Sequence, residues 1–173
     1  VMITKYTGSS IKVRIPEKVE HEPVTRIGDS AFEDSKATFV YIPNSVQVID
    51  EYAFSKCAGL MSITIPNNVT KIGDSALIMS TGLRDLQIGN GVTEIGFGVF
   101  AGCTGLTNVT IPDNVTVIGL KAFSKCTGLT SITIPDSVKE IGESAFQGCT
   151  ELTSVTIPDS VTKIGEQAFQ GCT

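Results

Sequence analysis

The sequence predicts a solenoid of 23-residue repeats, each contributing one short strand to a shared parallel β-sheet. The first observation is an Ile-Pro dipeptide that recurs along the chain and is replaced once by Ile-Gly. The second is that a large apolar residue follows each of the last six of these isoleucines by twelve positions, and the third is a cysteine column three positions later. The repeated isoleucines are Ile15, Ile42, Ile65, Ile88, Ile111, Ile134 and Ile157. A period held this strictly is the signature of a solenoid, in which each repeat packs only on its neighbours.

The strand of each repeat is predicted by an alternation of apolar and polar residues. In the repeat that begins at Leu129, the residues Leu129, Ile132 and Ile134 are apolar, whereas Ser131 and Thr133 between them are polar. A period of two is typical of a short strand with one buried face. Pro135 is expected to end the strand, because proline has no N–H to donate to a continuing ladder.

The second half of each repeat is expected to turn back toward the core. Gly142 is predicted to supply backbone freedom for the turn, and Asp50 takes this position in one repeat as a residue that tolerates left-handed geometry. A helical turn is expected to carry Ala145 and Phe146 inward. Cys149 then closes the layer, which gives about eight inward residues in each repeat.

Composition excludes several classes of protein. The 41% hydrophobic fraction is large enough for a core, so intrinsic disorder is excluded. No apolar run approaches the ~18 residues that a membrane-spanning helix needs. A net charge of -5 argues against nucleic-acid partners. With a single histidine and no catalytic motif, the sequence predicts neither an enzyme nor a cofactor or metal site.

The five cysteines are predicted to be small buried residues. Four of them are spaced by 23 residues and therefore stack one per layer. Parallel side chains on such a ladder leave their Cβ atoms farther apart than the ~3.8 Å that a disulfide prefers. No C-x-x-C motif indicates a zinc site. Cys172 is expected to be the most exposed and the most reactive thiol.

A column of acidic residues follows the prolines and has two interpretations. Asp113, Asp136 and Asp159 occupy this column, and Asn67 and Asn90 precede them. Stacked carboxylates could bind Ca²⁺, which takes several oxygen ligands. An acid beside proline more often accepts hydrogen bonds from its own turn, and this second interpretation is favoured.

The outward positions of the strands vary in a way that the core positions do not. Late repeats carry pairs such as Ser131 and Thr133, whereas an early repeat carries Phe39 and Tyr41. Aromatic and arginine residues are the usual anchors of protein interfaces. The alternative is that first repeats are simply less regular and that a preceding segment covers Phe39. The predicted binding residues are Lys12, Arg14, Phe39, Tyr41, Met61, Arg84, Asp85 and Gln87.

These motifs resemble a known family. The strand L-x-x-I-x-I-P matches the L-x-x-L-x-L strand of leucine-rich repeats, and the fuller pattern IP-[DN]-[SN]-V-T-x-IG-x-x-AF-x-x-C-x-x-L is similar to the BspA-like repeat of bacterial and protist surface proteins. The resemblance covers residues 11–173. It implies an α/β, right-handed leucine-rich-repeat solenoid with a parallel sheet on the concave face. Short strands, turns and helical turns would form the convex side of one domain, residues 1–173, with about seven repeats.

Three departures from the family pattern stand out. The asparagine position of ordinary leucine-rich repeats is not held throughout, so an unbroken asparagine ladder is not expected. One repeat is degenerate, with Leu77, Ser80 and Gly89 in the phenylalanine, cysteine and proline columns. An insertion at residues 17–23 resembles the one that commonly follows the family's N-terminal strand. The sequence stops at residues 171–173 without another strand or a polar cap, so we expect a fragment of a longer protein.

The resemblance implies a cell-surface or extracellular protein that adheres to host or extracellular-matrix proteins, fibronectin among them. It also implies a role in virulence. The first hypothesis is therefore a non-enzymatic module that binds a protein through its concave strand face, because a solenoid offers a long surface without a deep cleft. The second hypothesis is a structural spacer or assembly element that associates end to end.

Overall fold

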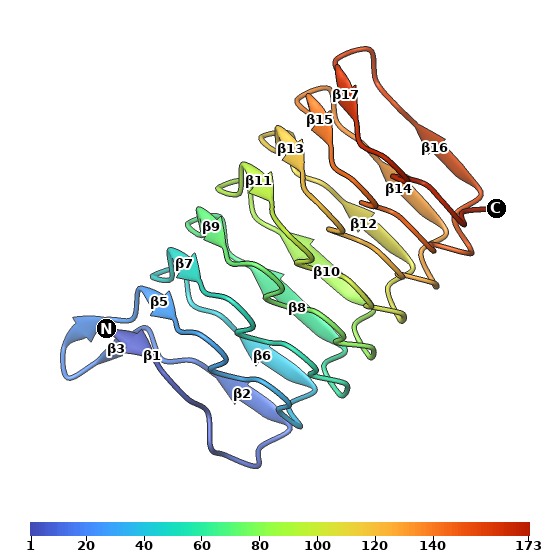
Figure 1. The fold of residues 1–173 in the computed structure, drawn as a ribbon. Helices are drawn as coiled ribbons and strands as arrows, with labels where there is room; N and C mark the ends of the chain where they lie inside the picture. The colour runs from blue at the N-terminus through green and yellow to red at the C-terminus, as the bar shows by residue number, and fades with distance from the viewer.

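The computed structural model describes all 173 residues as a stack of parallel β coils, with the N-terminus at one end and the C-terminus at the other (Figure 1). The strands of one side are β2 (Lys12–Arg14), β6 (Phe39–Tyr41), β8 (Ser62–Ile65), β10 (Asp85–Ile88), β12 (Asn108–Thr110), β14 (Ser131–Thr133) and β16 (Ser154–Thr156). The strands of the second side are β1 (Met2–Ile3), β5 (Arg26–Ile27), β7 (Val48–Ile49), β9 (Lys71–Ile72), β11 (Glu94–Ile95), β13 (Val117–Ile118), β15 (Glu140–Ile141) and β17 (Lys163–Ile164). We call the outward side of the first set the strand face.

The predicted parallel pairing and its register are confirmed. Residues one repeat apart lie opposite each other, so that Ser131 pairs with Asn108 on one side and with Ser154 on the other. The insertion at residues 17–23 forms an antiparallel hairpin of β3 (Lys18–Val19) and β4 (Glu22–Pro23). The fold is therefore a parallel β-solenoid of about seven turns, as the period predicted.

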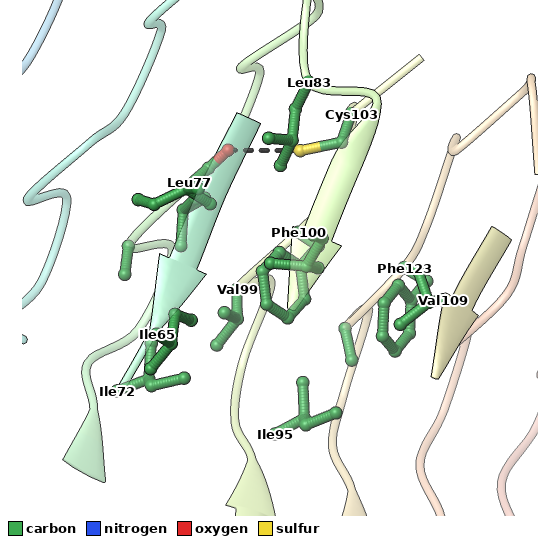
Figure 2. Packing of buried hydrophobic residues seen from close by; sticks show 14 of the residues in the cluster. Ile65, Ile72, Leu77, Leu83, Ile95, Val99, Phe100, Cys103, Val109 and Phe123 are labelled. Carbon is green, nitrogen blue, oxygen red and sulfur yellow. Dashed lines mark hydrogen bonds between the residues drawn. The ribbon is translucent and has the colours of Figure 1, made fainter. Parts of the chain in front are cut away.

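The core consists of columns of identical residue types stacked between coils. One cluster of 45 buried residues runs through the solenoid. Within it, the ring of Phe123 stacks on Phe100 and Phe146, with centroid distances of 5.3 and 5.4 Å. Figure 2 shows Phe100 and Phe123 in two adjacent coils, and Leu77 in the coil before that of Phe100. Leu77 is fully buried and interrupts the aromatic stack.

The predicted helical turns, and with them the α/β class, are wrong. No residue is helical, and the segment after the second strand is a run of turns. Its N–H groups alternate between two partners: Ile78 donates to Ser75 within the coil, whereas Leu77 donates to Val99 of the next coil. Ser75 and Met79 adopt positive φ angles of 55° and 58°. A helix cannot form because every second N–H is used between coils and left-handed residues recur within the segment.

The glycine column has a different cause from the predicted one. Gly142 is not left-handed, and neither is Asp50. A Cβ on Gly142 would instead lie 2.6 Å from the carbonyl carbon of Gly119 in the preceding coil. Glycine is therefore favoured in this column wherever the coils approach as closely as they do here. Asp50 occupies the position once and pairs with Arg26 through two hydrogen bonds.

One junction on the second side of the solenoid is open. At the other junctions, the residue in the glycine column donates its N–H to the preceding coil, as Gly119 does to Ile95 over 2.7 Å. Gly96 makes no such bond to Ile72, and β9 and β11 belong to separate sheets. A Cβ on Gly96 would meet only the Oδ1 atom of Asp74, at 3.3 Å. A cavity of about 330 Å³ lies here, and Ile72 is 6% exposed whereas Ile95 is fully buried.

A second opening lies on the strand face, one coil later. β10 pairs with β8 but not with β12, while β11 pairs with β13. The coil of residues 85–103 is therefore joined to the preceding coil through the strand face and to the following coil through the second side. The bonds of the turn segment continue across both junctions, as from Leu77 to Val99 and from Gly102 to Ser124.

This difference between junctions predicts opposite outcomes for two glycine substitutions. Gly142→Ala is expected to cost about 1–3 kcal/mol, because its Cβ collides with backbone. Gly96→Ala is expected to be neutral or to stabilise by less than about 1 kcal/mol, because the methyl group would meet only the end of the Asp74 side chain, which can move aside, and because the unfolded chain loses freedom. Urea unfolding followed by circular dichroism measures both. Equal destabilisation by the two variants would contradict the open junction.

Candidate functional site

The structure brings most of the predicted binding residues together on the strand face. Register places Lys12 opposite Phe39, and Phe39 opposite Ser62, which in turn lies opposite Asp85. A second row runs beside it and consists of Arg14, Tyr41, Thr64 and Gln87. The two rows cross the four neighbouring strands β2, β6, β8 and β10, which follow one another in Figure 1.

Two aromatic residues of β6, Phe39 and Tyr41, lie within these rows, and we call them the aromatic pair. Phe39 is 42% exposed, although it is a large apolar residue within a strand. The guanidinium carbon of Arg14 lies 4.5 Å from the centre of the Tyr41 ring, which is a cation–π arrangement. At an exposed site such a contact contributes about 0.5–1 kcal/mol and favours one arrangement of the two side chains.

A third row lies just before the strands and contains a residue that the sequence analysis missed. The predicted residues Met61 and Arg84 are in this row, and so is Ile11, which is 61% exposed. The backbone joins the row, because Arg84 donates its N–H to the carbonyl of Met61 over 2.9 Å. The signal was present in the sequence: late repeats hold threonine in this column, as at Thr130, and Ile11 departs from it.

Exposed apolar side chains are therefore concentrated near the N-terminal end of the strand face. Ile11, Phe39 and Met61 come from three consecutive coils and are each more than 40% exposed. Positive charge from Lys12 and Arg14 borders them at the first coil. A cavity of about 190 Å³ lies beside the aromatic pair. Apolar anchors with a charged border are the usual composition of a protein interface.

The acidic column after the prolines forms no metal site. No three histidine, cysteine, aspartate or glutamate side chains lie close enough together to hold a metal ion. The turn beside Asp136 is closed by the main chain, with the N–H of Val138 donating to the carbonyl of Pro135 over 3.0 Å.

The cysteines are free thiols, as predicted, and four of the five are buried. Each Sγ donates to a carbonyl of the preceding coil, as Cys103 does to Leu77 over 3.3 Å (Figure 2). Burial raises the pKa of Cys103 and of Cys149 to about 12. Ser80 replaces one cysteine and makes the same contact, donating to the carbonyl of Phe54 over 2.7 Å.

This arrangement predicts selective thiol labelling. At pH 8, a maleimide reagent is expected to modify Cys172, which is half-buried, long before the other four thiols. Burial raises the pKa of all five thiols, that of Cys172 included, so few of them are thiolates at pH 8. Only thiolates react at a useful rate, and Cys172 is the one thiol that is partly exposed to the reagent. Mass spectrometry of peptides from native protein should find the label at Cys172, and urea should release the others. Fast labelling of Cys103 in the native protein would contradict the packing.

Comparison with protein families identifies the repeat family of this chain. The BspA type leucine rich repeat region matches in six copies, over residues 25–149 and 93–173. The chain belongs to the BspA type leucine-rich repeat family. Leucine-rich repeat proteins are generally protein-interaction or surface proteins, and the fold is generally non-catalytic.

Solved structures agree with the BspA-type assignment. A leucine-rich repeat protein from Eubacterium ventriosum is 27% identical in sequence and has a TM-score of 0.89. The match covers 99% of this chain and 46% of the Eubacterium protein chain. A leucine rich cell surface protein from Faecalibacterium prausnitzii is 40% identical in sequence and has a TM-score of 0.87. The match covers 99% of this chain and 48% of the Faecalibacterium protein chain. The leucine-rich repeat protein of T. pallidum is 28% identical in sequence and has a TM-score of 0.68. The match covers 95% of this chain and 73% of the T. pallidum protein chain.

The BspA-type chain thus spans less than half the length of the first two of these structures. Comparison with curated proteins finds no match. The structure contains no helix of the length and apolar character needed to cross a membrane.

Proposed function

We propose that this BspA-type chain is a non-enzymatic, protein-binding module and that its binding surface is the N-terminal half of the strand face. The observation that carries the proposal is the exposure of Ile11, Phe39 and Met61 beside the Arg14–Tyr41 stack. Exposed apolar side chains that gather on one face in this way usually mark an interaction site. The remaining predicted residues, Lys12, Arg84, Asp85 and Gln87, form the polar border of the same surface.

The proposed partner is a host or extracellular-matrix protein, with fibronectin as one candidate, and the proposed location is the cell surface or the extracellular space. The description of the Faecalibacterium relative as a cell surface protein supports this location. We further propose that residues 1–173 act as one domain, because a single cluster of buried residues runs through them.

Binding to immobilised matrix proteins tests the proposal directly. Purified chain is passed over fibronectin, laminin and collagen, with albumin as the control surface, and binding is followed by surface plasmon resonance. Saturable binding to a matrix protein supports adhesion. Binding to none of them, or equal binding to albumin, would contradict it.

A second function, a structural spacer or assembly element, is favoured by a different observation. The outward strand positions of the late coils repeat small polar pairs, Ser131 with Thr133 and Ser154 with Thr156, and carry no aromatic or arginine side chain. A spacer holds another domain at a distance and needs no ligand surface in these coils. Light scattering behind a gel-filtration column, at increasing protein concentration, tests self-assembly: a concentration-dependent dimer supports it, and a monomer at all concentrations contradicts it.

A further inference from the structure

A continuous groove crosses the ends of the strands beside the aromatic pair. Three hollows of about 190, 280 and 250 Å³ follow one another from β6 to β12. The first and second share Asn44, Thr64 and Pro66 in their walls, and the second and third share Gln87 and Ile88. We call these three hollows the strand-end groove.

The walls of the strand-end groove are uncharged and rich in amides. Asn44, Asn67, Gln87 and Asn90 contribute exposed side chains, and no acidic or basic residue lines any of the three hollows. Each amide offers both hydrogen-bond donors and an acceptor. Only the Asn67 amide is engaged within the chain, through Oδ1, which accepts the N–H of Asn90 at 3.0 Å.

The amides follow the position of the groove along the chain. Asparagine fills the column after the proline position at Asn44, Asn67 and Asn90, in the coils where the hollows lie. Beyond the groove, the same column holds Asp113, Asp136 and Asp159. The turn is closed in the same way in both halves, because Val69 and Val138 each donate to the proline carbonyl three residues before them. The main-chain closure of the turn therefore does not account for the change from acid to amide, and this change coincides with the hollows.

The two ends of the groove differ in chemistry. At one end, Phe39 and Tyr41 form an aromatic wall that suits an apolar side chain. At the other end lies the opening between β10 and β12, where the parallel ladder is interrupted. β10 and β12 remain neighbours in the stack there but share no ladder hydrogen bonds.

From these observations we infer that the strand-end groove binds an extended, uncharged peptide segment of a partner protein. The inference rests on the proposed protein-binding function and specifies the partner as an unfolded segment rather than a folded surface. An extended main chain presents donors and acceptors along its whole length, which the asparagine and glutamine amides match. Three coil spacings of ~4.8 Å give a groove of roughly 14 Å, which accommodates about four residues at ~3.3 Å each. An aromatic or aliphatic residue of the segment packs against Phe39 and Tyr41.

The test uses a display library of random linear peptides selected on the intact chain. The triple variant Asn44→Asp, Asn67→Asp and Asn90→Asp installs the residue that late coils already carry in this column, and an aspartate at position 67 retains the acceptor for the Asn90 N–H. We expect selected peptides to be uncharged, to contain an aromatic or aliphatic residue, and to bind the triple variant at least about tenfold more weakly. The matched control Asp136→Asn with Asp159→Asn should bind as the unmodified chain does, and thermal melting should show that both variants fold.

Four results would overturn the inference. The first is that no selected peptide binds the chain in solution, and the second is that peptides bind the triple variant equally well. The third is that a glycan array, and not the peptide library, shows binding that the triple variant loses, which would assign the groove to an oligosaccharide. A matrix protein that needs Phe39 and Tyr41 but tolerates the triple variant would overturn the groove while the proposed function stands. Peptide binding that the triple variant loses, without binding to any matrix protein, would support the groove and contradict the proposed adhesion to matrix proteins.

Discussion

A Phe123→Ala variant is expected to be about 3–5 kcal/mol less stable than the unmodified chain, because the side chain is fully buried and both of its stacking partners lose a neighbour. Coils of a solenoid contact only adjacent coils, so a cavity in the middle also weakens the interface that joins the two halves. We therefore expect the urea unfolding curve of this variant to shift to lower concentration and to separate into two transitions. Circular dichroism across a urea series measures both effects.

The chain supplies its own matched control for this substitution. Leu77 fills the same column and is fully buried, so the layer accommodates an aliphatic side chain of this size. Phe123→Leu is accordingly expected to cost much less than the alanine variant, about 1–2 kcal/mol. If the alanine and leucine variants were equally stable, the aromatic column would not hold the coils together as described.

A Phe39→Ser, Tyr41→Thr double variant is expected to weaken binding of a protein partner by at least about 100-fold. Central aromatic residues of an interface typically contribute 2 kcal/mol or more each, and roughly 1.4 kcal/mol corresponds to a tenfold change in affinity. The two new residues are those at the equivalent positions of a late coil, Ser131 and Thr133. The strand should therefore keep its pairing while the surface loses its anchors.

The matched control for the binding experiment is Ser131→Ala with Thr133→Ala, which lies on the same face of the solenoid outside the proposed surface. Surface plasmon resonance against the matrix protein that binds the unmodified chain gives both affinities. Equal affinity of the Phe39→Ser, Tyr41→Thr variant and the unmodified chain, with both folded, would remove the aromatic pair from the interface.

The sequence was sufficient to predict the strands and the core because both depend on side-chain pattern. Apolar alternation fixed which residues of each strand point inward, and the period fixed their register, as the pairing of Asn108, Ser131 and Ser154 shows. The predicted surface residues lie together for the same reason: a register of one repeat places Lys12 beside Phe39 and Arg14 beside Tyr41.

Features that depend on main-chain geometry were not predictable in this way. Alternating intracoil and intercoil hydrogen bonds replaced the expected helical turn, and residues such as Ser75 and Met79 adopt left-handed angles that their identities do not favour. The glycine column was assigned to turn freedom, although the close approach of Gly142 to Gly119 explains it. The open junction at Gly96 left no signal in that column, because the glycine is present at open and closed junctions alike.

The proposed function confines binding to the N-terminal half of the strand face. Hydrogen–deuterium exchange of the chain, with and without a saturating matrix protein captured in the binding assay, locates the surface that the partner covers. We expect the partner to slow exchange in β2, β6, β8 and β10 and to leave β14 and β16 unchanged. Slowed exchange in β14 and β16, with β2 and β6 unaffected, would contradict it.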